Sequence, residues 1–344
     1  MKILVTGGCG FIGSHFIEHT LSQYPDAKVV NLDALTYAAH PDTQSYLARL
    51  GGDRYQFVHM DIADPKFKGV LKEHRIEAVV NFAAESHVDR SILDPDAFLR
   101  TNIMGLQNIL NACRDLGGVR LVHVSTDEVY GSLSPTDPQF TESSSLDPNS
   151  PYAASKASAD LVALASCRTY DLPVLITRCT NNYGPFQFPE KLLPLLIANA
   201  VEDKTIPVYG DGMQVRDWIY VKDHCSGIDA VLRKGRVGEV YNISASHELP
   251  NLELIKKVLG IMGKSESLME HVGDRPAHDR RYGLSSEKIS TELGWKPAYS
   301  LDQGLEETIR WYLENEPWWK KVRGKDYDKY YQANYANKFT ATST

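Results

Sequence analysis

A glycine loop close to the start of the chain constrains the fold more than any other feature. The letters T-G-G-C-G-F-I-G hold Gly7, Gly10 and Gly13 at a G-x-x-G-x-x-G spacing. An aliphatic run, Lys2–Val5, precedes the loop, and a helix-length segment, Phe11–Gln23, follows it. Glycine permits a tight turn and lets backbone N–H groups approach a pyrophosphate at a helix N-terminus. The loop therefore predicts a dinucleotide-binding strand–turn–helix unit, with a glycine turn that binds no ligand as the alternative.

Short apolar strands alternate with helix-length segments over the first half of the chain. The expected strands are Lys2–Val5, Lys28–Leu32, Gln56–Met60, Ala78–Phe82, Arg120–Val124 and Val174–Arg178. The expected helices between them are Phe11–Gln23, Pro65–His74, Pro95–Leu116 and Pro151–Tyr170. Several strands are apolar on both faces, which is typical of a sheet covered by helices on both sides. This alternation predicts an α/β fold built on a Rossmann-type, doubly wound parallel sheet.

The regular alternation of strands and helices ends after the sixth expected strand. Helices are expected near Lys191–Val201, Lys222–Arg233, Leu252–Met262, Ser286–Leu293 and Leu301–Asn315, with a strand at Glu239–Ile243. The helix and strand between residues 222 and 243 repeat the earlier pattern, so we expect the chain to return to the sheet there. Thr340–Thr344 is expected to be a frayed end.

Charge and cysteine content exclude several classes of protein. The formal net charge of −7 leaves no basic surplus for nucleic acid or an anionic membrane, and no apolar stretch is long enough to span a bilayer. The glycine loop follows Met1 too closely for a signal peptide. The 5 cysteines are scattered without a C-x-x-C pair, as in a reducing cytosol. His15 and His19 share a helix face without a third ligand, so we expect a cytoplasmic enzyme without a metal.

An acid stands where dinucleotide-binding folds contact a ribose. Asp33 lies about twenty residues beyond Gly13, at the end of the second expected strand. Its carboxylate can accept hydrogen bonds from the adenine ribose hydroxyls, and it would repel a 2′-phosphate. The first arginine after Gly13 is Arg49, well beyond Asp33. The expected cofactor is therefore NAD rather than NADP.

The ends of two further expected strands carry residues that can contact the cofactor. Asp61 ends the third expected strand and can meet the adenine amine, although a helix N-cap or a plain loop acid is an equally open interpretation. Phe82, Ala83 and Ala84 end the fourth expected strand, and the two alanines would allow a cofactor to approach closely. Open α/β sheets bind ligands at such carboxyl ends of strands.

Tyr152 and Lys156 form a Y-x-x-x-K pattern in the expected helix Pro151–Tyr170. Positions i and i+4 share a helix face, so the lysine cation, with a cationic nicotinamide nearby, would lower the phenol pKa from about 10. A phenolate there can accept a hydroxyl proton while hydride leaves for NAD. The alternative is a solvated helix face, which the preceding dinucleotide loop disfavours.

Two adjacent acids follow the expected strand Arg120–Val124, in the order Thr126, Asp127, Glu128. Acids at the end of a buried strand are costly unless they are solvated, paired or functional. Neighbours in an extended backbone point in different directions, so one acid can face each side of a substrate carbon chain. This arrangement suits an elimination, in which a base removes an α-proton and an acid protonates the departing hydroxyl. A loop with two solvated acids is the alternative.

Together these motifs resemble the extended short-chain dehydrogenase/reductase superfamily and, over nearly the full chain, most closely the dTDP-glucose 4,6-dehydratases. The glycine loop and Y-x-x-x-K are typical of the superfamily, whereas the Thr-Asp-Glu triplet is specific, because related epimerases and decarboxylases lack the full acid pair. Further matching segments are Leu35–Ala38, Ala83–Ser91, Ser125–Gly131, Pro151–Lys156, Asn181–Pro185, Pro189–Leu192, Val215–Trp218 and Asp274–Asp279. The chain departs from the family pattern at Ala39, His40 and Ala277.

The resemblance implies that dTDP-glucose becomes a 4-keto-6-deoxy sugar nucleotide and water. Tyr152, supported by Lys156 and Thr126, would serve oxidation at C4. Glu128 would then remove the C5 proton while Asp127 protonates the C6 hydroxyl, and hydride would return to C6. A UDP-glucose 4,6-dehydratase or a sugar-nucleotide 4-epimerase is the nearest alternative. A non-catalytic NAD-sensing protein is a further one, which the Tyr–Lys pair disfavours.

The resemblance also implies binding residues and organisation. The NAD site would comprise Gly7, Gly10, Phe11, Ile12, Gly13, Asp33, Ala34, Leu35, Thr36, Asp61, Ile62, Phe82, Ala83, Ala84, Thr101, Tyr152, Lys156 and Asn182. The nucleotide sugar would contact Ser86, Thr126, Asn181, Lys191, Leu192, Pro207, Val208, Tyr209, Arg216, Asn251, Arg275, His278 and Tyr335. Residues 1–180, with 218–243 returning, would bind NAD, and a smaller C-terminal substrate-binding domain would comprise 181–217 and 244–344. A homodimer through the helices Pro95–Leu116 and Pro151–Tyr170 is expected.

Overall fold

The main sheet consists of seven parallel strands in the doubly wound order. The computed structural model describes residues 1–39, 41–274 and 278–323. The strands lie in the order β10 (Val240–Ile243), β6 (Val174–Cys179), β5 (Arg120–Thr126), β4 (Ala78–Asn81), β1 (Lys2–Thr6), β2 (Lys28–Asp33) and β3 (Tyr55–His59). All six pairings between neighbours are parallel. This topology confirms the Rossmann-type fold predicted from the sequence.

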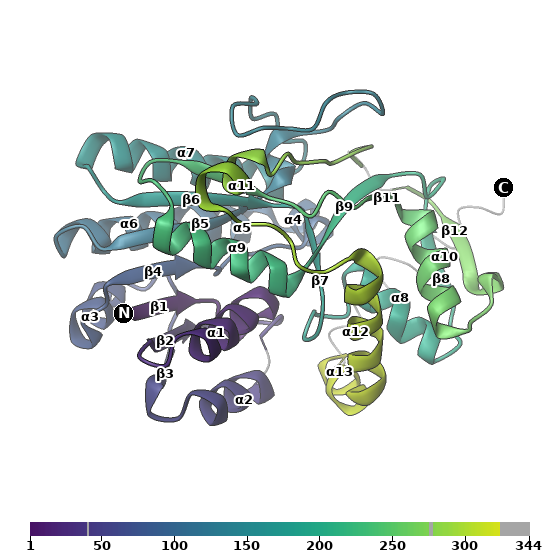
Figure 1. Cartoon of the computed structure of the whole chain (residues 1–344), viewed down its shortest axis with the longest axis horizontal. Helices are drawn as coiled ribbons and strands as arrows, with labels where there is room; N and C mark the ends of the chain where they lie inside the picture. The colour runs from purple at the N-terminus through teal and green to yellow at the C-terminus, as the bar shows by residue number, and fades with distance from the viewer. Residues whose placement is uncertain (40, 275–277, 324–344) are drawn as a thin grey trace.

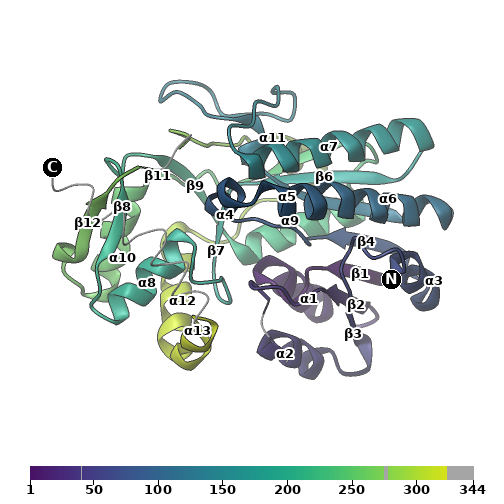
Figure 2. The same cartoon turned by 180° about the vertical axis from the view of Figure 1, so that it is seen from behind.

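Helices cover both faces of this sheet (Figures 1 and 2). One face carries α1 (Phe11–Gln23), α2 (Pro41–Gly51) and α9 (Val221–Lys234), with α11 (Glu287–Leu293) against α9. The other carries α3 (Phe67–His74), α4 (Val88–Leu93), α5 (Pro95–Phe98), α6 (Leu106–Asp115) and α7 (Pro151–Tyr170). Val80 packs into the hydrophobic cluster on the first face and Val79 into the cluster on the second. The strands are apolar on both sides because both sides are buried.

A second lobe lies beside the carboxyl ends of the strands, at the right in Figure 1. Its small sheets have the orders β11 (Glu248–Pro250), β9 (Val215–Tyr220), β7 (Asn181–Tyr183) and β12 (Met269–Val272), β8 (Ile206–Tyr209). Its helices are α8 (Leu192–Val201), α10 (Asn251–Met262), α12 (Leu301–Glu314) and α13 (Glu316–Val322). Two segments of the chain build this lobe. Between them the chain forms α9 and β10, and β10 pairs with β6 at the edge of the main sheet.

The helix expected over Pro95–Leu116 is divided in the structure. A π-helical turn, η2 (Leu99–Gly105), separates α5 from α6. A Cβ at Gly105 would lie only 2.6 Å from Ile62 Cδ1, so this glycine lets the turn pack directly on the loop after β3. Such π-turns are frequent at functional sites. The remaining short turns are 3₁₀-helical: η1 (Gly52–Arg54), η3 (Asp127–Tyr130) and η4 (Glu266–Leu268).

The structure bears on the expectations about membrane spans, cysteines and metal sites. Within the described ranges, no helix has the length and apolar character needed to cross a membrane. All five cysteines are described and are free thiols. No group of three or more His, Cys, Asp or Glu side chains among the described residues is placed to hold a metal ion. The expected frayed end, Thr340–Thr344, lies outside the described residues.

Candidate active site

A cavity of about 370 Å³ runs along the carboxyl ends of the central strands, where the strand order reverses between β1 and β4. The predicted cofactor residues that line it are Gly7, Gly10, Phe11, Ile12, Gly13, Asp33, Ala34, Thr36, Asp61, Ile62, Phe82, Ala83, Ala84, Thr101, Tyr152, Lys156 and Asn182. Leu35 is the exception within the predicted set. Its backbone is left-handed, with φ of 51°, and its N–H donates to Asp33 Oδ1 at 2.8 Å.

The glycine loop leaves room that any side chain would fill. Gly7 has a φ of +68°, and a Cβ there would lie 2.8 Å from the backbone nitrogen of Ala83. A Cβ at Gly13 would lie 2.4 Å from the carbonyl oxygen of Gly7, so the helix packs tightly on the loop. No side chain caps α1 at Gly10, and the first turn of the helix opens into the cavity. This arrangement fits a pyrophosphate at the helix N-terminus.

Asp33 ends β2 at the wall of the cavity. Its carboxylate accepts the backbone N–H of Cys9 at 2.8 Å and that of Leu35 at 2.8 Å. Burial raises the pKa of Asp33, and these two donors oppose that shift. A carboxylate has about four acceptor sites, so capacity remains for the hydroxyls of a ribose. The residues present therefore fit a dinucleotide without a 2′-phosphate.

Thr126, Asp127 and Glu128 lie where β5 passes into η3. Thr126 Oγ1 accepts the N–H of Glu128 at 3.3 Å and thereby caps the turn. Asp127 is only 2% exposed, and its Oδ2 has no hydrogen-bond partner within the described part of the chain. Burial and the charges of Glu128 and Asp217 raise the pKa of Asp127 well above its ordinary value. The protonated form of Asp127 is therefore favoured, as a general acid requires.

Tyr152 and Lys156 face the cavity from the first turns of α7. The helix begins after Ser150, whose Oγ accepts the N–H of Ala153 at 3.1 Å. Burial and the Glu128 charge raise the pKa of Tyr152 well above its ordinary value, while a hydrogen bond with Thr126 lowers it. The protein alone therefore does not produce the low phenol pKa expected from the Y-x-x-x-K spacing. Burial also lowers the pKa of Lys156 to about 8.

The predicted substrate residues divide into two groups. Ser86, Thr126, Asn181, Lys191 and Leu192 line the same cavity as the cofactor residues. Lys191 reaches across it, since its Nζ donates to the carbonyl oxygen of Ser86 at 2.7 Å.

The second group lies outside this cavity. Its described members are in the second lobe: Pro207, Val208, Tyr209, Arg216, Asn251 and His278. Two further predicted members, Arg275 and Tyr335, lie outside the described residues.

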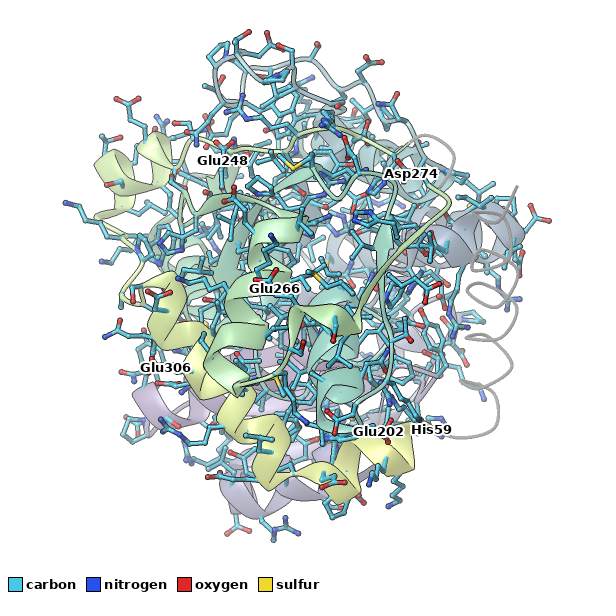
Figure 3. All side chains as sticks on the ribbon, turned by 90° about the vertical axis from the view of Figure 1, so that its right-hand side faces the viewer. His59, Glu202, Glu248, Glu266, Asp274 and Glu306 are labelled. Carbon is cyan, nitrogen blue, oxygen red and sulfur yellow. The ribbon has the colours of Figure 1, made fainter. Side chains whose placement is uncertain are left out.

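Aromatic and acidic side chains surround His278 in the second lobe. The rings of Tyr209 and His278 meet edge to face with centroids 6.1 Å apart. His278 Nδ1 lies 2.5 Å from Asp274 Oδ1, and Tyr209 donates to Asp89 Oδ2 at 3.4 Å. Figure 3 looks onto this lobe and labels Asp274 near its upper edge. The Tyr209 contact joins the lobe to α4 of the main domain.

Arg216 is buried between the second lobe and the acid pair. Its Nη2 donates to the carbonyl oxygen of Asp279 at 2.9 Å, and its guanidinium lies 4.3 Å from the centre of the Tyr282 ring. The Arg216 charge opposes the rise in the pKa of Asp127, which shows that the two side chains interact electrostatically. Asn251 begins α10, and its N–H donates to Gln214 O at 2.9 Å.

Sequence reasoning missed several residues of the cavity wall. Glu85, Cys179, Thr180, Gln187, Glu190 and Trp218 line the cavity but were not predicted. Cys179 ends β6, so the rule that ligands bind at strand ends could have found it. Glu190 is buried and accepts from the Arg90 guanidinium at 3.1 Å. Glu190 lies in the segment Pro189–Leu192 that matches the family pattern, but no local pattern indicates its contact with Arg90, which is 100 residues away.

Comparison with known proteins identifies the family of this chain. A family model described as "GDP-mannose 4,6 dehydratase" matches residues 4–308. The dTDP-glucose 4,6-dehydratase of Xanthomonas campestris pv. campestris (strain B100) is 48% identical to this chain, with 94% of this chain and 96% of that protein covered.

Solved structures extend the comparison to the fold. The dTDP-glucose 4,6-dehydratase from Streptomyces venezuelae, with NAD and TYD bound, has a TM-score of 0.90 and 49% identity, covering 94% of this chain and 100% of that one. The UDP-glucose 4-epimerase from Thermotoga maritima has a TM-score of 0.84 and 27% identity, covering 92% and 100%. The fold is thus common to both enzymes, whereas the sequence is nearer to the dehydratase.

Proposed function

The chain belongs to the GDP-mannose 4,6 dehydratase family, and on that premise we propose that it converts dTDP-glucose to dTDP-4-keto-6-deoxy-D-glucose and water. The observation that carries the proposal is one cavity lined by the acid pair Asp127 and Glu128, by Tyr152 and Lys156, and by the glycine loop. The high identity to proteins named dTDP-glucose 4,6-dehydratase supports the choice of substrate. The enzyme is an NAD-dependent hydro-lyase.

NAD fits the cofactor half of the cavity. The glycine loop and the uncapped N-terminus of α1 would hold the pyrophosphate, and Asp33 would hold the adenine ribose. When bound, NAD accepts hydride from C4 of the sugar and later supplies hydride to C6, so the reaction needs no external reductant.

Tyr152 serves the first step as a base. It takes the proton of the C4 hydroxyl, while Lys156 supplies a nearby positive charge and Thr126, whose hydroxyl donates to Asp127 Oδ1 at 3.2 Å, supports it from the same cavity wall. The sugar becomes a 4-ketone. The carbonyl then acidifies the neighbouring C5–H bond.

The acid pair serves the elimination. Glu128 removes the C5 proton, and the electron pair forms a C5–C6 double bond as the C6–O bond breaks. Asp127 donates its proton to the departing hydroxyl, which leaves as water. Burial raises the pKa of Asp127 and so favours the protonated form that this step needs. Glu128, now protonated, can return a proton to C5 when C6 is reduced.

The nucleotide sugar is held between the two parts of the chain. We assign residues 1–180 with 218–243 to NAD binding and residues 181–217 with 244–344 to nucleotide-sugar binding, with α11 of the second range packed against α9 and β10 of the main domain. Lys191 and Arg216 supply positive charge for the diphosphate, while Tyr209 and His278 contact the nucleoside.

The enzyme acts as a homodimer in the cytoplasm. Leu93 in α4, Met104 in η2 and Leu161 in α7 are 71%, 61% and 58% exposed. Helices α4 and α7 lie on the same face of the main sheet (Figure 2). Exposed apolar side chains on one face favour association with a second copy. Five free cysteines support a reducing compartment.

The purified protein, incubated with dTDP-glucose, tests the proposal. We expect a 4-keto-6-deoxy product without added reductant, and slower turnover of UDP-glucose and CDP-glucose under the same conditions. Formation of only a C4 epimer would show an epimerase instead. Preferred turnover of UDP-glucose would contradict the assigned nucleotide.

A further inference from the structure

A cluster of charged and polar side chains lies buried behind the cavity, and the mechanism above uses only one of its members. We call His123, Lys156, Asp160 and Arg178 the buried charge cluster. Each is at most 3% exposed. They come from three neighbouring elements of the main domain: β5, α7 and β6. Burying charges is costly unless they are paired, so the cluster requires a physical explanation.

The contacts within the cluster link the lysine and the carboxylate only through His123. Lys156 Nζ donates to the carbonyl oxygen of Val124 at 2.7 Å and lies 3.4 Å from His123 Nε2. Asp160 Oδ2 accepts from Arg178 Nε at 2.8 Å. Asp160 Oδ1 lies 3.8 Å from His123 Nε2 and has no hydrogen-bond partner among the described residues. The cluster thus holds two cationic side chains and one carboxylate.

Three titratable groups interact directly with Lys156: Asp160 on α7, His123 on β5 and Cys179 on β6. Tyr152 on α7 and Asp127 and Glu128 on η3 line the same cavity as Lys156, and Arg178 on β6 is bonded to Asp160.

Asp160 is the group in this set that opposes loss of the lysine proton most strongly. Burial lowers the pKa of Lys156 to about 8, and the charge of Asp160 is the largest opposing cause. Burial and the charges of Lys156 and Arg178 push the pKa of His123 well below its ordinary value, so the imidazole stays neutral. Burial also raises the pKa of the Cys179 thiol to about 12, which keeps it uncharged.

We propose that Asp160 is a positioning residue of the active site: its carboxylate, bonded to Arg178 and one helical turn from Lys156 on α7, keeps the buried Lys156 in its ammonium form beside Tyr152. The inference rests on the proposed function, because the lysine charge matters only if Tyr152 performs the C4 proton transfer. Asp160 itself touches neither substrate nor cofactor.

The pH profile of Asp160→Asn tests the proposal. In the wild type, the Lys156 charge is present below its pKa of about 8, and activity is lost as the pH rises through that value. Removing the carboxylate lowers this pKa, so the alkaline limb of the kcat profile should move down by about one pH unit or more. A uniform loss of kcat at every pH, with the alkaline limb unmoved, would indicate a merely structural role and overturn the proposal.

Arg178→Gln is the matched variant, with the opposite expected sign. It leaves Lys156 as the remaining cation beside Asp160, so the alkaline limb should move to higher pH. This variant also tests the proposal if Asp160→Asn does not fold. An alkaline limb of the kcat profile that stays in place or moves to lower pH in Arg178→Gln contradicts the proposal.

A measurement without substrate separates this inference from the proposed function. The protein is labelled with carbon-13 at the lysine ε position, and the Lys156 resonance is assigned by its absence in Lys156→Met. We expect this resonance to titrate at lower pH in Asp160→Asn than in the wild type. If it does so while the wild type leaves dTDP-glucose unchanged, the proposed function fails and the role of Asp160 stands. An unshifted titration overturns that role.

Discussion

Asp127 and Glu128 are neighbours in the chain but occupy different environments. Asp127 is buried beside Asp217 and Glu128, whereas Glu128 is partly exposed at the cavity wall. Burial disfavours the charged form of the inner carboxyl, while partial exposure lets the outer one interact with water. Two carboxyls with environments that differ in this way can act as an acid and a base in one reaction.

Asp127→Asn should slow water loss far more than C4 oxidation. The amide keeps the shape of the side chain but has no carboxyl proton to donate to the C6 oxygen. We expect about 10²- to 10⁴-fold slower elimination, the usual contribution of a general acid. Stopped-flow absorbance of the reduced nicotinamide follows oxidation, and product analysis follows elimination. Equal slowing of the two steps would contradict the acid role.

At the scale of elements, the loop between β1 and α1 depends on backbone contacts that leave no space for a side chain. The carbonyl oxygen of Gly7 lies where a Cβ of Gly13 would be, and Ala83 closes the loop from β4. The helix N-terminus is thereby held against the strand ends. Its position, rather than any side chain, makes the anion site.

Gly13→Ala should lower both the amount of NAD bound to the purified protein and its Tm. The new Cβ would lie 2.4 Å from Gly7 O, so α1 must move away from the loop. NAD content after purification and the Tm measure the two effects. Gly260→Ala in α10 is the control, because a Cβ there meets nothing within 4 Å. That control should be neutral or gain up to about 1 kcal/mol. Gly13→Ala with wild-type NAD content would refute the packing argument.

At the scale of the whole molecule, the helices on the two faces of the main sheet differ in how far the rest of the chain covers them. The face of α1 and α9 continues into the hydrophobic cluster of the second lobe. The face of α4 and α7 instead leaves Leu93 and Leu161 in solvent. An apolar surface that no part of the described chain covers is the surface expected to meet a second copy.

If the proposed dimer forms through this face, Leu161→Glu should convert it to a monomer. A carboxylate in an apolar interface loses its hydration on association, and that loss opposes dimerisation. Light scattering on the eluting protein should give about twice 38.5 kDa for the wild type and about 38.5 kDa for the variant. Leu313→Glu is the control, since Leu313 is similarly exposed on α12 in the other lobe. A monomeric wild type would exclude the proposed assembly.

Much of the fold was predictable because its causes are local. The helices Phe11–Gln23 and Pro151–Tyr170 have the bounds expected from the sequence, since a glycine loop and an N-terminal proline mark where they begin. The π-turn at Leu99–Gly105 and the short strands of the second lobe were missed. Strands of three or four residues, such as β7 and β8, show no usable periodicity, and their partners are distant in the chain.

The sequence by itself determined the alternation of strands and helices in the main sheet and the residue types that carry the chemistry, because glycine sterics and apolar periodicity act over a few neighbouring residues. Only the tertiary structure decided the electrostatic environment of that chemistry. The pKa of Asp127 depends on Asp217 and Arg216, and that of Lys156 on its burial between β5 and β6. Desolvation and charge act through space, so the protonation states of the site exist only once the chain has folded.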